Sequence, residues 1–341
     1  MSLRAALTVL LLFLAGAPGA SAQFVASGAL QPAQLAIVIN DDEPNSVAVG
    51  EYYQRRRAVP AANVVHVKIP GKPHQLDAEQ FAQLKEQIDA HLGPEVQAVL
   101  MVWTAPYAVE CNSITGAYSL GFDPAQCAKT CAAGRPSAYF NAASGKPYSE
   151  LGIRLSMLLP IESVALAKAV IDRGVASGFK IVPASAYYLV TSEAARNSRA
   201  GFFPPSGKIA ARKLTTKLIK GDVLEGARDI VIYETGMAHV DKLDTLKFVP
   251  GALADHLTSL GGDLLGEGQM SSLRWLEAGA TASYGAVSEP CNHWQKFPNP
   301  SVLLKHYVQG NSAIEAYWKS VAWPAQGLFI GEPLAAPYRR R

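Results

Sequence analysis

The first half of the chain alternates between apolar runs and amphipathic stretches. Residues 35–40, LAIVIN, form a continuous apolar run with β-branched side chains, which is typical of a strand buried on both faces of a parallel sheet. After Asp77, apolar residues recur at every third or fourth position, which predicts an amphipathic helix capped by Asp77. The order strand, helix, strand, helix, strand predicts a parallel sheet with helices on both faces. The elements expected here are strands at 35–40, 64–69 and 96–103, a helix at 47–57 with Ser46 as its N-cap, and the helix after Asp77.

Regular periodicity returns after residue 160. No internal repeat or linker interrupts the chain, so we expect one α/β domain over residues 23–338, built as a three-layer sandwich around a parallel sheet. The expected elements of this half are helices at 161–177, 208–219, 249–262, 271–283, 302–308 and 313–320, and strands at 187–191, 227–236 and 327–331.

Between these halves, residues 104–159 break the pattern. The segment is rich in Gly, Pro, Ser and Asn and holds three of the four cysteines, Cys111, Cys127 and Cys131. Long segments without regular structure are uncommon inside compact domains and often carry function. We therefore expect an irregular insert that is held in place by disulfides.

The N-terminus has the pattern of a secretory signal peptide. Arg4 precedes a short apolar run, and Ala20, Ser21 and Ala22 form an A-x-A cleavage site, so residues 1–22 are expected to be removed. No later stretch is long and apolar enough to span a membrane. The sequence predicts an exported protein, periplasmic or extracellular, with no membrane span after cleavage.

Charge does not point to a nucleic-acid partner. The formal net charge is +3, and Arg4 together with the basic tail at 339–341 accounts for this excess. Without these four residues the net charge is 3 − 4 = −1, so no nucleic-acid binding is expected. The sequence indicates no cofactor, and it leaves the partner and the oligomeric state open.

Four cysteines in an exported chain predict two disulfides with three possible pairings. We favour a local clip between Cys127 and Cys131 and a long-range link between Cys111 and Cys291, although the sequence leaves the pairing open. In VSEPCNHWQKFPNP, residues 287–300, an extended backbone would project Glu289, Cys291 and His293 to one side, as a metal or catalytic site requires. Three prolines favour a loop instead, so we expect Cys291 in a disulfide and no metal.

Ligands of open parallel sheets bind beyond the carboxyl ends of the strands. After the first strand come Asn40, Asp41 and Asp42, which could bind a cation or form a solvated loop, and which lack the spacing of a calcium loop. After the strand at 227–236 comes His239, whose near-neutral reference pKa suits a general base. The chain has no G-x-S-x-G, H-E-x-x-H or glycine-rich phosphate-loop motif.

Several blocks resemble an uncharacterised family of exported bacterial proteins, notably LAIVINDDEPNSVAVGEYYQRRRAVPAANVVHV and GATASYGAVSEPCNHWQKFP. That family has no established activity to carry over. A more distant resemblance is to gingipain-type cysteine peptidases, which implies a caspase-like α/β fold. VIYETGMAHV is similar to their strand that ends in His-Gly, and ALADHLTSLGG occupies the place of their strand that ends in the nucleophilic cysteine.

The chain departs from the gingipain pattern at the nucleophile. No cysteine lies between Gly236 and Gly262, and a Cys–His peptidase needs a thiolate beside the imidazole. One hypothesis is a hydrolase with Ser259 as nucleophile, His239 as base and Asp255 as orienting residue. The favoured hypothesis is a non-catalytic binding protein that uses polar residues of the strand-end loops and the insert. Its candidate residues are Asn40, Asp41, Asp42, Asn112, Ser113, Glu289 and Asn292.

Overall fold

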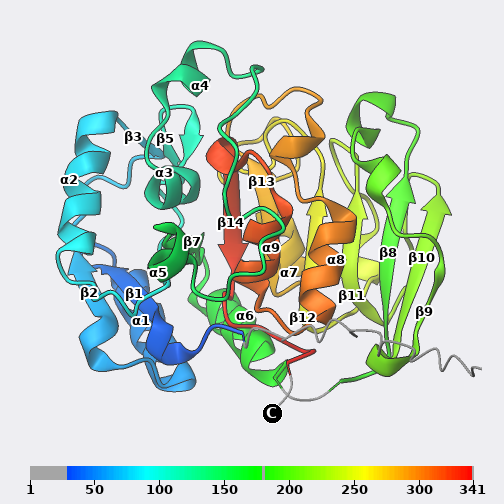
Figure 1. Cartoon of the computed structure of the whole chain (residues 1–341), viewed down its shortest axis with the longest axis horizontal. Coiled ribbons are helices and arrows are strands. Elements are labelled where there is room, and N and C mark those ends of the chain that lie inside the picture. The colour runs from blue at the N-terminus through cyan, green and yellow to red at the C-terminus, as the bar shows by residue number, and fades with distance from the viewer. Residues whose placement is uncertain (1–28, 179–180, 340–341) are drawn as a thin grey trace, which may run out of the picture.

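A computed structural model describes residues 29–178 and 181–339 of the chain (Figure 1). The expected signal peptide at 1–22 lies outside these described residues, as do residues 340 and 341 of the basic tail. In the described part of the chain, no helix combines the length and the apolar character that crossing a membrane requires.

The core is an 11-stranded sheet whose described strands are parallel except at two pairs. β9 is antiparallel to β10 at one edge, and β13 is antiparallel to β14 in the interior. The last strand of the chain, β14, therefore lies between β7 and β13 in the middle of the sheet (Figure 1). The order is β2 (Val64–Val67), β1 (Leu35–Asn40), β4 (Ala98–Val102), β7 (Leu155–Leu158), β14 (Gly327–Gly331), β13 (Ala282–Ala286), β12 (Phe248–His256), β11 (Ile230–Thr235), β8 (Ala184–Val190), β10 (Leu214–Lys220) and β9 (Gly207–Ile209).

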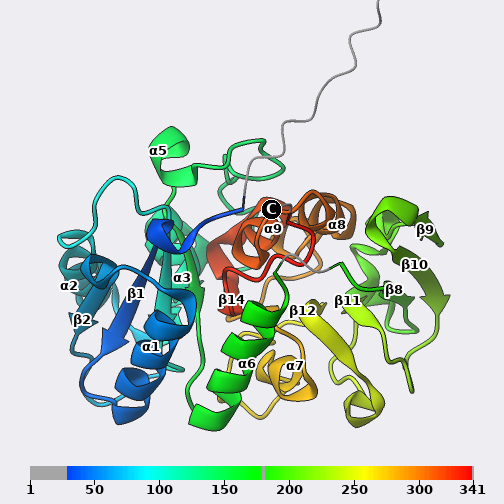
Figure 2. The ribbon, with the colours of Figure 1, turned by 90° about the horizontal axis from the view of Figure 1, so that it is seen from below.

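Helices cover both faces of this sheet, which confirms the predicted α/β sandwich. Figure 2 shows α1, α6 and α7 on one face and α8 and α9 on the other. The apolar faces of these helices and the strands between them form a large hydrophobic core, and a second, smaller cluster includes Trp275 of α7 and Tyr233 of β11. The helices are α1 (Pro44–Arg57), α2 (Ala78–Asp89), α3 (Ile114–Leu120), α4 (Pro124–Ala128), α5 (Pro147–Leu151), α6 (Val164–Ala176), α7 (Leu273–Ala278), α8 (Pro300–Val308) and α9 (Ala313–Ser320).

The first half of the chain follows its sequence pattern closely. All six residues of β1 are buried, and Asp77 caps α2 by accepting a hydrogen bond from the backbone of Gln80. Helix α1, however, begins before Ser46, whose side chain does not cap it. The Ser46 hydroxyl accepts from the Asn40 backbone N–H at 2.8 Å and donates to the Val102 carbonyl, so it ties α1 to β1 and β4.

Two segments expected to be helices are strands. Residues 249–262 contain most of β12, which is buried from Gly251 to its end between β11 and β13. Burial on both faces removes the polar positions that mark a strand, and the small residues then suggest a packed helix. Residues 208–219 contain most of β10, where Leu214 and Thr216 are buried and alternate with more exposed residues, which is the two-residue period of a strand.

The segment expected at 271–283 as one helix is α7 followed by the start of β13. Gly285 in β13 faces the backbone of Gly261, and a Cβ atom at Gly285 would lie 2.2 Å from the Gly261 carbonyl carbon. This close approach lets the loop after β12 cross β13, and only glycine permits it.

The insert at 104–159 is more regular than expected. It supplies β7 to the main sheet, and it contains α3, α4 and α5. A small sheet also forms from β3 (Gln75–Leu76), β5 (Ala108–Val109) and β6 (Asn112–Ser113). These elements are short and separated by Gly- and Pro-rich turns, so the sequence has no long periodic stretch that predicts them.

All four cysteines form disulfides, as expected, but the favoured pairing is wrong. Cys111 pairs with Cys127 and Cys131 pairs with Cys291, each with a Cα–Cα distance of 5.2 Å. The side chain of Asn112 exchanges two hydrogen bonds with the backbone of Asp123 at the start of α4. This contact brings Cys127 back to Cys111 and leaves Cys131 to reach the loop after β13.

Candidate functional site

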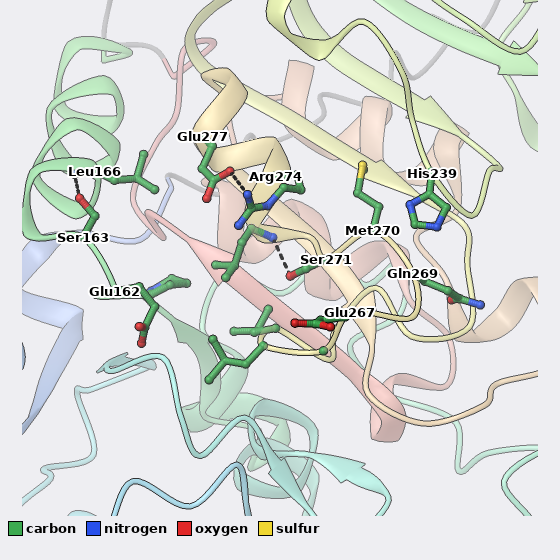
Figure 3. A pocket seen from close by; sticks show the side chains of 15 residues that line it. Glu162, Ser163, Leu166, His239, Glu267, Gln269, Met270, Ser271, Arg274 and Glu277 are labelled. Carbon is green, nitrogen blue, oxygen red and sulfur yellow. Dashed lines mark hydrogen bonds and ion pairs between the residues drawn. The ribbon is translucent and has the colours of Figure 1, made fainter.

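A cavity of about 470 Å³ lies between α6, α7 and the loops that follow β7, β11 and β12 (Figure 3). Leu264, Met270 and Leu273 are buried side chains that line it, and Leu166 of α6 adds to the same apolar surface. Leu265 lies at its rim and is 37% exposed. The cavity therefore has the size and apolar lining of a small-molecule site.

Charged side chains ring the apolar lining. Three are acidic, Glu162, Glu267 and Glu277, and Arg274 pairs with Glu277 at 2.7 Å. Neither Glu162 nor Glu267 forms an ion pair with any residue that the structure describes. His239 lies at another side of the cavity, beside Met270 and Gln269 (Figure 3). The rim therefore carries an excess of negative charge.

The loop after β12 is held in place by its own hydrogen bonds. The Gln269 side-chain oxygen accepts from the Thr258 hydroxyl and from the Leu260 backbone N–H, both at 2.8 Å. The Met270 backbone N–H donates to the carbonyl of Ala238 at 3.0 Å. These contacts fix the cavity wall without a ligand.

A buried histidine supports the same wall. His256, at the end of β12, accepts a hydrogen bond at Nδ1 from the indole of Trp275, so its Nε2 donates to the Met270 carbonyl; both contacts are 2.9 Å. Burial lowers the pKa of His256 to about 3, and the imidazole is neutral at physiological pH. His256 is therefore a structural residue.

The three residues of the hydrolase hypothesis lie in three different environments. His239 is exposed and lines the 470 Å³ cavity, whereas Ser259 is half-buried and lines a separate cavity of about 90 Å³ beside Arg196 and Asn292. Among the described residues, no hydrogen bond joins Ser259 to His239. Asp255 is fully buried and pairs with Arg199 instead. The catalytic assignment of these residues stays a prediction.

Asp255 belongs to a buried ionic cluster under α8 and α9. Glu234 and Asp255 are register partners on β11 and β12, and both are fully buried. Arg199 reaches Glu234 Oε1 with Nη1 at 3.1 Å and Asp255 Oδ1 with Nη2 at 2.5 Å, and Nη1 also donates to the Pro298 carbonyl. One guanidinium thus serves two carboxyl groups that have no access to water.

Replacing Glu234 by Gln should weaken the pH dependence of stability. Burial raises the pKa of Glu234 well above its ordinary value, Arg199 opposes this rise, and Asp255 adds to it. A carboxyl group that binds its proton more tightly when folded makes the free energy of unfolding fall as pH rises above its unfolded pKa. Urea denaturation from about pH 5 to about pH 8 should show this fall in the wild type and a smaller fall in E234Q. Equal slopes would contradict the assignment.

The polar residues predicted for binding after β1 serve mainly the loop itself. Asn40 is buried; its amide donates to Glu43 at 3.1 Å, and its oxygen accepts from the Ile69 backbone at 3.0 Å. Asp41 is exposed and contacts His66 Nδ1 at 2.7 Å. Asp42 is exposed, and these loop residues do not line the 470 Å³ cavity.

The predicted binding residues of the insert are also engaged internally. Asn112 is buried between Asp123 and the Cys111–Cys127 disulfide. Ser113 is buried, caps α3 by accepting from the Gly116 backbone, and donates to the Gly327 carbonyl at 2.6 Å. Their assignment to a binding surface stays a prediction.

Glu289 and Asn292 are the predicted binding residues that stay open to solvent in the loop after β13. Glu289 accepts from the backbone of Cys291 at 2.7 Å, and Asn292 lines the 90 Å³ cavity. Sequence reasoning missed the rim glutamates, Glu162 and Glu267. The signal for Glu267 was present in GGDLLGEGQMSS, a long Gly-rich polar loop after what is in fact a strand.

Comparison with known proteins adds little to this description. No family model matches the chain, so the resemblance to an uncharacterised exported family stays an expectation. No curated protein matches either. One solved structure that matches is a complex of the pro- and mature domains of RgpB from Porphyromonas gingivalis, with 11% identity, a TM-score of 0.40, and coverage of 89% of this chain and 79% of that one. A similarity this low carries no argument about activity, so the resemblance to gingipains stays an expectation from the sequence.

Proposed function

We propose that this protein is exported and binds an organic cation with an apolar group in the cavity between α6 and α7, without acting on it chemically. The observation that carries the proposal is the pairing of a preformed apolar lining with two carboxylates, Glu162 and Glu267, that have no ion-pair partner in the described chain. The apolar part of a ligand would displace water from Leu264, Met270 and Leu273. The cationic part would lie near the rim.

The rim glutamates are exposed, so their electrostatic contribution to ligand binding should be small. Exposed ion pairs contribute roughly 0.2–1 kcal/mol each and are screened by salt. Most of the affinity should therefore come from the apolar lining, and the carboxylates should act mainly in selecting the sign of the ligand's charge.

Export is supported by two separate observations. The first 22 residues read as a signal peptide, and four cysteines form two disulfides, which are typical of exported proteins. Secretion of a tagged chain, with and without residues 1–22, tests this part directly.

The binding proposal is tested by thermal shift and calorimetry with matched alkylammonium, alkyl alcohol and alkylcarboxylate ligands. The cationic series should stabilise the protein, because a ligand that binds the folded state raises its melting temperature. The double variant E162Q/E267Q should lower affinity for the cation by roughly 10-fold and leave the alcohol unaffected. The control E79Q/E86Q, which makes the same charge change on exposed residues of α2, should bind like the wild type.

Two outcomes would overturn the proposal. Equal affinity of the wild type and E162Q/E267Q for the cation would show that Glu162 and Glu267 do not contribute to binding. Hydrolysis of esters or peptides by the wild type that is lost in both H239A and S259A would favour the hydrolase hypothesis instead.

A further inference from the structure

The Cys131–Cys291 disulfide joins the insert to the loop after β13. Two hydrogen bonds to backbone carbonyls support it at the same corner: His293 Nε2 donates to Cys131 at 2.8 Å, and the Lys296 ammonium donates to Thr130. Cys131 is exposed, whereas the other three cysteines are half-buried. A reductant in solution therefore has access to this corner.

A carboxylate stands beside this disulfide. One oxygen of Glu289 and the sulphur atoms of Cys131 and Cys291 all lie within 4.8 Å of one another. The backbone N–H of Cys291 donates to Glu289 Oε1 at 2.7 Å and keeps the carboxylate near the sulphurs. In the part of the chain that the structure describes, no other group brings three such ligand atoms together.

We propose that this corner is a redox-gated zinc site, closed by the disulfide when oxidised and formed by Cys131, Cys291 and Glu289 when the disulfide is reduced. A dithiol donates two electrons and two protons, the S–S bond breaks to give two thiols, and the dithiol becomes a disulfide. Zinc binding then releases the two thiol protons, because thiolates are the ligands. The two thiolates select Zn²⁺ over Mg²⁺ or Ca²⁺.

The geometry requires little movement. Two Zn–S bonds of about 2.3 Å in a tetrahedral arrangement place the sulphurs ~3.8 Å apart, which side-chain rotation allows from a Cα–Cα distance of 5.2 Å. Glu289 supplies the third ligand. The fourth position is open to water, because the described chain brings no fourth ligand atom within the same distance.

The second disulfide provides a matched control. Reduction of Cys111–Cys127 also yields two thiols, but the nearby polar group is the amide of Asn112, which contacts both sulphurs as a hydrogen-bond donor. A carboxylate or imidazole is not within ligand distance of that pair in the described residues. The two cysteine pairs therefore differ in the presence of Glu289.

The test is a zinc titration against a chromophoric chelator. The chain without its signal peptide is reduced anaerobically with a phosphine, desalted, and compared with the untreated protein. Reduced wild type and reduced C111S/C127S should each bind one equivalent of zinc, and the oxidised wild type should bind none. Reduced C131S/C291S should bind none, and E289Q should lose more than the ~10- to 100-fold in affinity that is typical of losing a partner outside the ligand shell.

Cobalt substitution adds a readout that does not depend on affinity. Visible d–d bands and sulphur-to-metal charge transfer should appear in reduced wild type and not in C131S/C291S. The proposal is overturned if reduced wild type binds no zinc, if C131S/C291S binds it as well as the wild type, or if E289Q binds as tightly as the wild type. E289Q changes an exposed residue and keeps both thiols, so it remains decisive if the serine variant does not fold.

Discussion

Replacing Arg199 by Met should lower the free energy of unfolding by about 3–5 kcal/mol at neutral pH. The substitution leaves Glu234 and Asp255 buried without the guanidinium that pairs with both. Met fills much of the volume of Arg, so the decrease in the free energy of unfolding should come from the unpaired carboxyl groups rather than from a cavity. The loss should shrink as pH falls, because protonation makes both carboxyl groups neutral.

The control for this prediction is R196M, three residues away. Arg196 pairs with Glu193 at a half-exposed position, so R196M should cost less than about 1 kcal/mol. Urea denaturation of the two variants at neutral and acid pH gives the comparison. An R199M protein with the urea midpoint of the wild type would show that the cluster contributes nothing to stability.

Removing the Cys131–Cys291 disulfide should cost more than removing Cys111–Cys127. The first links residues 160 positions apart and the second links residues 16 apart. A cross-link restricts the unfolded chain in proportion to the logarithm of the loop it closes, which gives about 5 kcal/mol for the long loop and about 3 kcal/mol for the short one. C131S/C291S should therefore be less stable than C111S/C127S by about 2 kcal/mol.

Chemical denaturation in metal-free buffer tests this difference. Adding a reductant supplies the internal control, because both variants and the wild type then lack cross-links and should converge in stability. If C111S/C127S is the less stable variant under oxidising conditions, local packing around Asn112 outweighs the loop length.

The sequence predicted the fold class and the first half of the sheet because those elements carry strong patterns. Residues 35–39, LAIVI, are uniformly apolar, and Asp77 precedes a clean amphipathic period, so neither element needs tertiary information to be predicted. Strand β12 could not be recognised in the same way. Its small residues pack against neighbours that come from distant parts of the chain, such as Ser177 beside Gly251.

The site was less predictable than the fold. The rule of strand ends drew attention to the loop with His239, which lines the 470 Å³ cavity, and it also selected Asn40, which does not. Polar residues at strand ends can bind a ligand or form hydrogen bonds with nearby backbone groups. Asn40 and Ser113 accept hydrogen bonds from backbone N–H groups close to them. Glu162 has no local sequence signature, and the Gly-rich loop that contains Glu267 does not show that the two side chains line one cavity, because their loops come together only in the folded chain.

The central position of β14 has a consequence for the order of folding. Residues 327–331 are made last among the strands, yet they separate β7 from β13 in the finished sheet. Until they arrive, both of these inner strands have an unpaired edge, and such edges recruit strands from other molecules. If the chain crosses a membrane during its export, these two strands can aggregate until the C-terminal segment has also crossed and β14 has paired with them.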